Sequence, residues 1–549
     1  MTSFASFLHH RWIRRVALAA GFVGAAWLGE RLLGVLLPFP LERLERRQTG
    51  EWSRVVTASD GTWLRVTANR RGERALPLPL TEASPHLIHA LLAAEDQRFF
   101  DHHGVDWLAV GRAAWSNLRH GGVVSGASTL TLQLVRIAEP RPRTLLSKLI
   151  EAFRARQLER SWTKEQLLAA YLDLAPLGSC RGFEAAAQRW FGGSARALDA
   201  AQAATLVAML PAPSRLTPER SPQELKARRD RILAAMSDQG WLGAPAYVAA
   251  SVKPLPDHSR VWPFEAPFWC DEVLAGRLQE GTLDRALERR IESLVANGDD
   301  AGADGAAVVV LGRADGEVKA LVGGRDWSAS HVDAALAPRD AGSTLKPFVY
   351  ALGLSLGVAG LETRLADVPT AFGDWVPRNF DGRFDGAVRG GAALGLSRNV
   401  PAVTLLDDVT TDRFAALLLE LGLPLPCGPL DLTAVLGTVA VSPLRLARAY
   451  RRFADPIAPL SLEPTARARV LAELADFAPL PGLPAGLPAD RAIAWKTGTS
   501  SGRRDAWCVA VTPGAIVVVW LGNLDATGAA DLVGLHAAAP LCAKVVAAL

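Results

Sequence analysis

The chain has 549 residues, too many for a single hydrophobic core, so two or three domains are expected. Hydrophobic residues make up 49% and charged residues 21% of the chain, which excludes a disordered protein. The formal net charge of +4 is small for this length and argues against nucleic acid as a partner. The five cysteines are far apart and include no C-x-x-C pair, so we assign no metal site and expect mostly buried free thiols.

Residues 1–40 predict a cytoplasmic tail and a transmembrane anchor. HHRWIRR precedes fourteen uncharged residues, VALAAGFVGAAWLG, and apolar sequence resumes after Glu30 and Arg31. Counted to Leu37, this stretch is long enough to cross a bilayer. The arginines before it place the start in the cytoplasm, so we expect a single-pass protein of the inner (plasma) membrane with its catalytic domains outside the cytoplasm. A cleaved signal peptide is the alternative, because GAA is suited to cleavage.

A helical region follows, from about residue 80 to residue 240. TEASPHLIHALLAAEDQRFF and SKLIEAFRARQLERSWTKEQLLAAYLDL carry apolar residues at i, i+3 and i+4. We therefore expect a mostly helical domain over 41–240. The Pro-rich stretch KPLPDHSRVWPFEAPF predicts a linker, which we place over 241–300.

Two glutamates, Glu95 and Glu151, fall on different helices of this region. Glycosyl transfer uses such a pair, one carboxylate to deprotonate a sugar hydroxyl and the other to assist the departing group. Lys148, Lys164 and Arg136 are candidates to face a phosphate-bearing leaving group. Taken singly, each of these residues is equally typical of a solvent-facing helix surface, so the surrounding sequence must decide.

Five blocks of sequence in this region resemble the peptidoglycan glycosyltransferase domain, glycosyltransferase family 51. They are EDQRFFDHHG, SGASTLTLQLVRI, SKLIEAFRARQLE, KEQLLAAYLDLAPLG and RRDRILAAM. The resemblance implies a lysozyme-like helical lobe with a membrane-facing lobe, and Glu95 as the general base on the acceptor sugar. It implies Glu151 as the second carboxylate and Lys148 as a diphosphate contact. A divalent cation such as Mg²⁺ could assist the diphosphate, although the sequence shows no dedicated cluster of ligands for it. The residues that the resemblance assigns to the substrate cleft are Ser128, Thr129 and Gln133.

The chain departs from the family's pattern at Ala127, Leu132, Ser147 and Asp173. Ser147 replaces an arginine before Lys148, which puts the full diphosphate affinity in doubt, whereas no departure removes a proposed catalytic group. The stretch VDWLAVGRAAWSNLRHGG, residues 105–122, has tryptophans and leucines among basic residues. It is suited to dip into a membrane interface, and a buried core helix is the alternative.

From about residue 305 the pattern changes to strands. AAVVVLGRADGEVKALVGG predicts two strands joined by a turn at ADGE, and AWCVAVTPGAIVVVWLGN predicts two more around TPG. Helical stretches such as TLLDDVTTDRFAALLLELG lie between them. We therefore expect an α/β (α+β) domain with an antiparallel sheet over 301–549.

Three short motifs in this second domain point to acyl transfer. GSTLKP contains Ser343 and Lys346, in a chain that has only eight lysines among its 60 basic residues. LGLSRNVPAV contains Ser397 and Asn399, and AWKTGTS begins its motif at Lys496. The set S-x-x-K, S-x-N and K-T-G, in this order, is typical of penicillin-binding proteins.

The residue types fit this chemistry. A neutral Lys346, one helical turn after Ser343, can take the serine's proton, whereas an arginine cannot lose its own. We expect Ser397 to relay a proton, Asn399 to hold a substrate amide and Lys496 to attract a substrate carboxylate. In the third motif Thr497 and Thr499 offer hydroxyls, and Gly498 keeps the strand free of bulk where substrate must lie. The backbone N–H groups of Thr499 and Ser343 would form an oxyanion hole.

Both domains behind one anchor resemble the class A bifunctional penicillin-binding proteins over nearly the whole chain, and most resemble the 1C type without its extra C-terminal domain. The resemblance implies an enzyme that polymerises lipid II and cross-links stem peptides through a Ser343 acyl-enzyme, with no cofactor for transpeptidation. Its expected partners are lipid II, nascent peptidoglycan, membrane lipid, β-lactams as covalent inhibitors and proteins of a cell-wall synthesis complex. Arg398, where lactamases have aspartate, fits a transpeptidase.

Two other classes of protein share part of this pattern. A membrane-anchored β-lactam sensor would have the acylable serine and the anchor, but no use for the five glycosyltransferase blocks. A catalytically degenerate scaffold would keep the fold and lose the activity. A lipid II polymerisation assay separates an enzyme from a scaffold.

Overall fold

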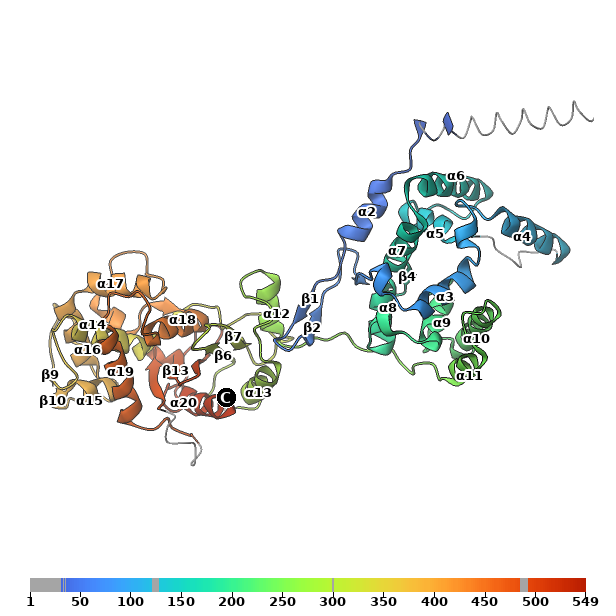
Figure 1. Ribbon diagram of the computed structural model, residues 1–549. Coiled ribbons are helices and arrows are strands. Elements are labelled where there is room, and N and C mark those ends of the chain that lie inside the picture. The colour runs from blue at the N-terminus through green and yellow to red at the C-terminus, as the bar shows by residue number, and fades with distance from the viewer. Residues whose placement is uncertain (1–30, 33, 35, 121–127, 299–300, 484–491) are drawn as a thin grey trace, which may run out of the picture. The chain divides into compact units, whose positions relative to one another are not determined.

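The computed structural model describes residues 31–32, 34, 36–120, 128–298, 301–483 and 492–549. The chain divides into two compact units: unit 1 comprises residues 1–55 and 66–262, and unit 2 comprises residues 56–65 and 263–549 (Figure 1). Most of the predicted anchor lies outside the described residues. Among the helices that are described, none combines the length and the apolar character that a membrane crossing requires.

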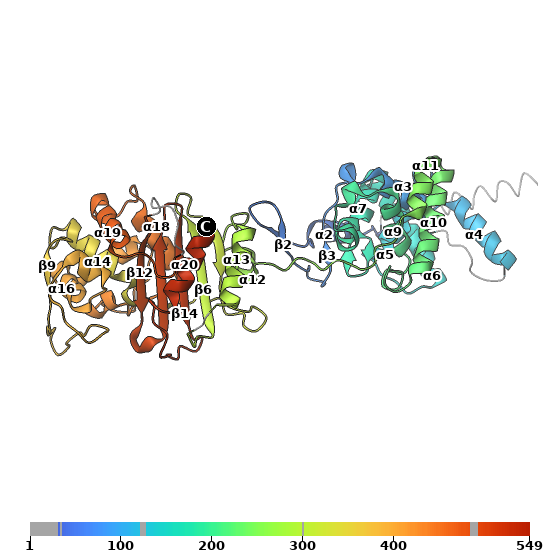
Figure 2. The same ribbon diagram turned by 90° about the horizontal axis from the view of Figure 1, so that it is seen from below.

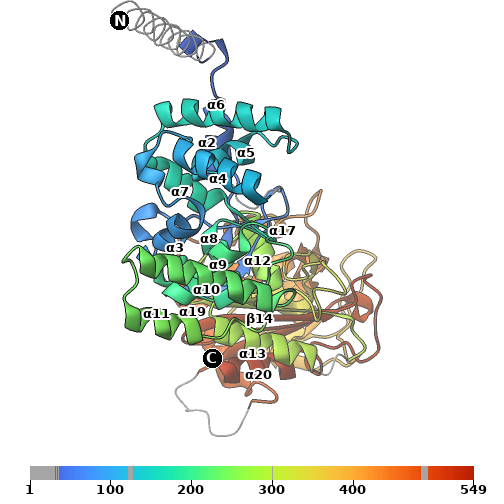
Figure 3. The ribbon, with the colours of Figure 1, turned by 90° about the vertical axis from the view of Figure 1, so that its right-hand side faces the viewer.

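Unit 1 consists mainly of helices, as the periodicity of its sequence predicts. They are α2 (Leu41–Thr49), α3 (Pro85–Glu95), α4 (Trp107–His120), α5 (Leu130–Ala138), α6 (Leu145–Ser161), α7 (Lys164–Leu174), α8 (Phe183–Phe191), α9 (Ala200–Met209), α10 (Pro222–Asp238) and α11 (Ala244–Val252). Short strands β3 (Arg74–Ala75), β5 (Cys180–Arg181) and β4 (Pro176–Leu177) form a small sheet in that order. The alanine-rich α9 is buried along nearly its whole length and packs against α3, α8 and α10 (Figure 3).

Several of these helices begin at a side chain that caps them. Thr129, Thr144 and Thr163 accept hydrogen bonds from the first-turn N–H groups of α5, α6 and α7. Such caps satisfy backbone donors that have no partner inside the helix. The cap at Thr129 fixes where α5 begins, and so which of its residues face α3 and α6.

Unit 2 is built around a five-stranded antiparallel sheet in the order β12-β13-β14-β6-β7, which confirms the prediction of an antiparallel sheet. The strands are β6 (Gly305–Gly312), β7 (Val318–Val322), β12 (Ala494–Thr499), β13 (Asp505–Val511) and β14 (Ala515–Gly522). Helices α13 (Arg285–Ala296) and α20 (Ala538–Ala548) pack on the sheet at one face (Figure 2). Helix α18 (Pro443–Ala454) packs on β6 and β14 within another hydrophobic cluster, which also contains Leu345 of the Ser343 segment. This central sheet is therefore covered by helices and buried on both faces.

The other elements of unit 2 surround the sheet. They are α12 (Pro267–Leu274), β8 (Arg339–Asp340), η4 (Gly342–Leu345), α14 (Lys346–Ser355), β9 (Arg364–Asp367), β10 (Gly386–Arg389), α15 (Gly390–Gly395), α16 (Asn399–Val409), α17 (Thr411–Glu420), η5 (Leu432–Leu436), β11 (Ala440–Val441), α19 (Pro464–Phe477) and η6 (Ser501–Arg503). Strands β1 (Val55–Thr57) and β2 (Trp63–Val66) also belong to unit 2, except for their end residues Val55 and Val66. The segment 241–300, where we expected a linker, holds α11, α12 and α13, and the units divide within it after Trp262.

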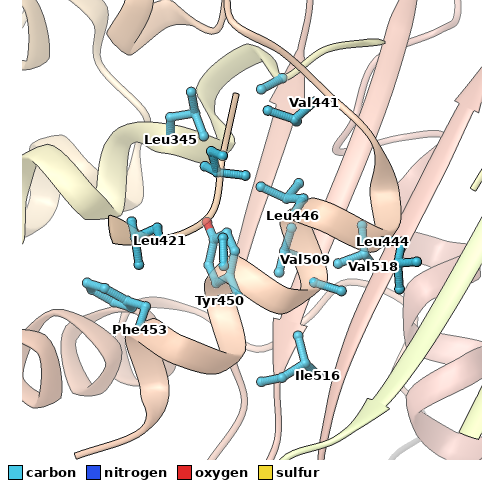
Figure 4. Close-up of a cluster of buried hydrophobic side chains, with 14 of the residues drawn as sticks. Leu345, Leu421, Val441, Leu444, Leu446, Tyr450, Phe453, Val509, Ile516 and Val518 are labelled. Atoms are coloured by element: carbon cyan, nitrogen blue, oxygen red, sulfur yellow. The ribbon is translucent and has the colours of Figure 1, made fainter. Parts of the chain in front are cut away.

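A hydrophobic cluster joins α18 to the sheet and to η4 (Figure 4). Leu446, Tyr450 and other side chains of α18 pack with Val509 and Val518 of the sheet and Leu345 of η4. The Tyr450 hydroxyl donates a hydrogen bond to the Thr344 carbonyl oxygen at 2.5 Å. Burial of this tyrosine stabilises the fold, and its hydrogen bond holds the backbone next to Ser343 in place.

Candidate active sites

Glu95 lies at the last residue of α3, half-buried. Its Oε2 accepts a hydrogen bond from Gln133 Nε2 at 2.7 Å, and Gln133 Oε1 accepts one from the Tyr171 hydroxyl at 2.6 Å. Burial raises the pKa of the Glu95 carboxyl, and the Gln133 hydrogen bond opposes that rise. A fixed carboxylate with a raised pKa is suited to accept a proton.

A buried pair next to Glu95 supports it. His102 Nε2 lies 2.9 Å from Asp96 Oδ1, and Asp96 Oδ2 accepts the Leu130 N–H at 3.0 Å. The Thr129 hydroxyl donates to the Gly104 carbonyl oxygen at 2.7 Å. Gly104 has φ of +84°, and a Cβ there would lie 2.9 Å from the Ala155 carbonyl oxygen of α6. The block EDQRFFDHHG is therefore folded onto α5 and α6 through Asp96 and this glycine.

The second predicted carboxylate, Glu151 of α6, is buried and ion-paired with Arg136 of α5. Arg136 Nε and a terminal nitrogen lie 3.2 and 2.8 Å from its two carboxylate oxygens. Gln133 and Arg136 are three residues apart on α5, so one face of this helix contacts both Glu95 and Glu151. Arg136 neutralises Glu151 rather than standing free to meet a phosphate, as we had expected of it.

The remaining predicted residues of unit 1 fall in two environments. Ser128 is exposed and lines a hollow of about 160 Å³ together with Glu95 and Thr129. Lys148 is exposed on α6, open to a ligand. Lys164, by contrast, is 2.8 Å from the Glu159 carboxylate and lies over the Phe99 ring, so its charge is used within the fold.

The departures from the family pattern have structural explanations at two positions. Ser147 is buried at the start of α6, where its Oγ lies 2.9 Å from Thr144 Oγ1. Asp173 is buried and accepts hydrogen bonds from the Leu78 N–H and the Gln48 side chain. Burial raises the pKa of Asp173 to about 6. Asp173 thus holds the backbone at Leu78, and the Ser147 hydroxyl contacts the Thr144 side chain that caps α6.

Helix α4 exposes large apolar side chains: Trp107, Leu108 and Trp115 are each more than 60% exposed. The alternative of a buried core helix is therefore wrong for these three side chains. Leu145, Leu146 and Leu149 at the start of α6 are exposed as well. Apolar patches of this kind are typical of surfaces that meet a partner or a membrane.

Within the described residues, no group of three or more His, Cys, Asp or Glu side chains lies together in a way that could hold a metal ion. The carboxylates near Glu95 do not form a protein cage for Mg²⁺, which proteins often bind with one or two carboxylates and substrate phosphates.

In unit 2, Ser343 lies in η4, and Lys346 follows as the first residue of α14. The segment is packed backbone against backbone. A Cβ on Gly342 would lie 2.7 Å from the Thr499 nitrogen, and one on Gly437 would lie 1.9 Å from the Gly342 nitrogen. Glycine at 342 and 437, both with positive φ, therefore lets the serine segment approach the end of β12 and the η5 segment.

The Lys346 side chain is fully buried. Its Nζ donates to the Ser397 carbonyl oxygen at 2.6 Å, to Asn399 Oδ1 at 2.7 Å and to the Arg398 carbonyl oxygen at 3.1 Å. Burial and the nearby Lys496 and Arg398 charges hold the pKa of Lys346 well below its usual range, against the opposing effect of Asp367. A lysine in such surroundings can be neutral, as a base must be.

Ser397 connects the two lysines. Its Oγ accepts a hydrogen bond from Lys496 Nζ at 2.8 Å and lies 3.4 Å from Lys346 Nζ. Ser397 has φ of +59°, a left-handed conformation that is rare for serine and that concentrates at functional sites. Because it contacts both lysines, its hydroxyl is placed for proton relay.

Lys496 is buried, and burial lowers its pKa to about 7. Its Nζ also donates to the Thr497 carbonyl oxygen at 2.9 Å. Lys496 is only 3% exposed and is not among the residues that line the cleft. Its attraction for a substrate carboxylate stays a prediction.

The structure adds a second role for Gly498 of β12. A Cβ on Gly498 would lie 2.7 Å from the Ala341 carbonyl oxygen and 3.3 Å from the Ser343 nitrogen. Glycine here thus makes room for the chain's own η4 segment, and not only for substrate. Thr499 Oγ1 accepts the Gly534 N–H at 3.0 Å, which ties β12 to the segment before α20.

Residues from all three motifs border one cleft of about 760 Å³. Its lining includes Ser343, Ser397, Asn399, Thr497, Gly498 and Thr499. Arg378, Phe380 and Arg503 also line the cleft, although none belongs to a motif that the sequence singled out. Tyr171 and Tyr450 were likewise missed as supports of Glu95 and η4, since nothing in their local sequence indicates a distant hydrogen-bond partner.

Comparison with known proteins agrees with both sites. A family model described as Transglycosylase matches residues 60–237. Penicillin-binding protein 1C of Escherichia coli (strain K12) is 35% identical over 562 residues, which cover 97% of this chain and 71% of that protein. Penicillin-binding protein 1F of Bacillus subtilis (strain 168) is 32% identical, and that match covers 70% of this chain and 57% of the relative.

A solved structure supports the fold alone. The crystal structure of penicillin-binding protein 1A from Haemophilus influenzae matches with a TM-score of 0.56 and 17% identity, over 90% of this chain and 92% of that one. With the two sites described above, the fold and the matches define a bifunctional peptidoglycan glycosyltransferase and transpeptidase. The chain belongs to the class A penicillin-binding proteins, which confirms the resemblance seen in the motifs.

Proposed function

We propose that unit 1 polymerises lipid II with Glu95 as general base, and that unit 2 cross-links stem peptides through an acyl-enzyme on Ser343. The observation that carries the proposal for unit 2 is the pair of buried lysines, Lys346 and Lys496, that both contact the Ser397 hydroxyl. Such a pair lowers the stability of the fold, because both charges must be desolvated next to each other, so a catalytic role explains why it is present.

In unit 1, Glu95 takes the proton of an acceptor sugar hydroxyl as that oxygen attacks the donor's anomeric carbon. Gln133 and Tyr171 hold the carboxylate in one orientation. Exposed Lys148 is the cation that meets the departing diphosphate, and Ser128 and Thr129 line the cleft beside Glu95.

In unit 2, neutral Lys346 accepts the Ser343 proton as the serine oxygen attacks the penultimate peptide carbonyl. The backbone N–H groups of Ser343 and Thr499 stabilise the oxyanion that develops. Ser397 passes a proton between the lysines and the leaving amine, and Asn399 and Thr497 hold the substrate backbone. A second peptide's amine then attacks the acyl-enzyme and completes the cross-link.

The chain would work at a membrane surface. The exposed side chains of α4 and α6 are suited to the interface where a lipid-linked substrate lies, and residues 1–40 would anchor the chain with both units outside the cytoplasm. Contacts with other cell-wall synthesis proteins and the use of Mg²⁺ in glycosyl transfer are further expectations.

Two assays on the purified full chain in detergent test the proposal: polymerisation of lipid II, and covalent labelling by a fluorescent penicillin. We expect both, with labelling lost in Ser343→Ala and polymerisation unchanged. Labelling without polymerisation would favour the sensor. Neither reaction, in a protein with a native circular dichroism spectrum, would favour the scaffold.

A further inference from the structure

Arg398, the middle residue of the S-x-N motif, is turned away from the catalytic lysines into a group of carboxylates. A terminal nitrogen of its guanidinium lies 3.0 Å from both Asp381 oxygens, and the other lies 2.5 Å from Asp385. Both aspartates belong to residues 368–385, which join β9 to β10 and which we name the latch loop. Charged side chains usually lie on the surface, but the Arg398 side chain is only 12% exposed.

A third carboxylate completes the group from β9. Asp367 is fully buried, and its Oδ2 lies 3.7 Å from Arg398 Nε. The same carboxylate accepts two hydrogen bonds from Asn379 Nδ2, at 2.8 and 3.0 Å, and one from the Asp385 N–H at 3.0 Å. A buried carboxylate with this many donors fixes the groups around it.

The latch loop in turn holds the third residue of the motif. Asn379 Oδ1 accepts the Asn399 N–H at 2.7 Å, and the Asn399 side-chain amide donates to the Arg378 carbonyl oxygen at 2.7 Å. Asn399 Oδ1 is left to accept from Lys346 Nζ. Hydrogen bonds therefore run without a gap from the latch loop to the proposed base.

We propose that Arg398 is a positioning residue that clamps the latch loop against the S-x-N motif, and that the clamped loop orients Asn399 and Lys346 for acylation of Ser343. The proposal rests on the proposed function of unit 2 and goes beyond it. The Arg398 carbonyl oxygen accepts from Lys346 Nζ, whereas the guanidinium, to which the new role is assigned, bonds the aspartates of the latch loop. Because Arg378 and Phe380 of the same loop line the cleft, the clamp also fixes one wall against which the substrate lies.

The clamp has an electrostatic consequence at Lys346. The charged groups that face this lysine are Lys496 on β12, Asp367 on β9 and Arg398 itself. Arg398 lowers the pKa of Lys346 and Asp367 raises it. Without the arginine charge, burial and Lys496 would still lower the pKa of Lys346, but the raising effect of Asp367 would be less opposed, so this pKa would rise. Acylation, which needs neutral Lys346, would then begin at higher pH.

The test measures the second-order rate of Ser343 acylation by a fluorescent penicillin as a function of pH. Arg398→Met keeps the length and removes the charge. We expect acylation near neutral pH to slow roughly ten- to a hundredfold, the effect of losing a buried charge-assisted hydrogen-bond network. The rise of the rate with pH should move to higher pH. Arg398→Lys keeps the charge but lacks the planar guanidinium that bonds Asp381 and Asp385 through two separate nitrogens, so it should restore the pH profile and only part of the rate.

The matched control is Arg383→Met, the same change at an exposed arginine of the latch loop, which should acylate like the wild type. Lipid II polymerisation by unit 1 shows that each variant is folded and active elsewhere. A wild-type rate and pH profile in Arg398→Met would overturn the clamp while leaving the proposed function intact. A slower rate with an unmoved pH profile, not restored by lysine, would reduce Arg398 to a fold-stabilising residue. Failure of the wild type itself to label would instead remove the proposed function.

Discussion

The two candidate sites use the same physical effect on groups of opposite charge. In unit 1 a carboxyl group, Glu95, is partly desolvated, and burial raises its pKa. In unit 2 an amine, Lys346, is fully buried, and burial lowers its pKa. Desolvation disfavours whichever form is charged, so both groups move toward the range in which a general base works at neutral pH.

The supports of the two bases differ. Glu95 is held by the neutral side-chain amide of Gln133, which Tyr171 holds in turn, whereas Lys346 is held by backbone carbonyl oxygens and an amide, with a second buried lysine nearby. The half-buried Glu95 carboxylate should lose only part of its function when one partner is removed. A buried amine among acceptors tolerates no bulkier cation, so we expect unit 2 to be the less forgiving site.

The largest effect should come from Lys346→Arg. This variant tests whether unit 2 tolerates any other cation at the base, because it preserves the charge. Arginine remains protonated, so it cannot take the Ser343 proton. We expect acylation by a fluorescent penicillin to fall roughly 10²–10⁴-fold, as far as in Lys346→Ala. Exposed Lys544→Arg is the control and should label normally. Near-normal labelling of Lys346→Arg would show that the lysine acts only by its charge.

Glu95→Gln should produce a comparable or slightly smaller loss in unit 1 alone. Removing the carboxylate removes the base, so lipid II polymerisation should fall by roughly 10²–10⁴-fold, while penicillin labelling of Ser343 is unchanged. The control is Glu165→Gln, an exposed glutamate of α7. Wild-type polymerisation by the Glu95 variant would show that the base lies elsewhere.

Gln133→Leu should slow polymerisation less, by roughly tenfold, the effect of one lost hydrogen bond to a charged group, and should change its pH dependence. Gln133 lowers the pKa of Glu95 by hydrogen-bonding its charged form. Its loss should raise that pKa, so activity, which needs the carboxylate, should fall at a higher pH as the solution is acidified. A pH–rate profile measures this, with exposed Gln223→Leu as control. An unmoved acid limb would contradict the role of Gln133.

The smallest effect should be that of Tyr450→Phe, which leaves the Thr344 carbonyl without its buried donor. We expect the free energy of unfolding of unit 2 to fall by about 1–3 kcal/mol, measured by urea denaturation, and acylation to slow a few-fold. Tyr350→Phe is the matched control, because within the described residues the buried Tyr350 hydroxyl has no hydrogen-bond partner. Equal stabilities of the two variants would show that the Thr344 contact contributes nothing.

Local sequence predicted the parts of the fold that depend on periodicity and turns. The strand pairs around ADGE and TPG and the helices of residues 80–240 form as expected, because each is encoded within its own segment. The motifs also brought Ser343, Lys346, Ser397 and Lys496 into one set. Their side-chain contacts could not be foreseen, since those depend on how segments far apart in the sequence meet.

The misplaced expectations share a cause. Lys164 and Arg136 were expected to meet a phosphate, but each pairs with a glutamate of a neighbouring helix. The arrangement that matters there, α5 against α6 and α7, is tertiary and leaves no local signal. The contacts of Arg398 could not be predicted for the same reason, because the aspartates that it bonds belong to no recognisable sequence motif.

The close packing of Gly342 against Gly437 and Thr499 bears on how unit 2 folds. Three backbone segments from distant parts of the chain must meet before Ser343 has its environment. Contacts at such sequence separation carry a large loop-closure cost and form slowly. The ability to react with penicillin should therefore appear late during refolding, after most of the helical signal has returned. Labelling with a fluorescent penicillin at successive times of refolding would then measure when the tertiary structure of unit 2 is complete.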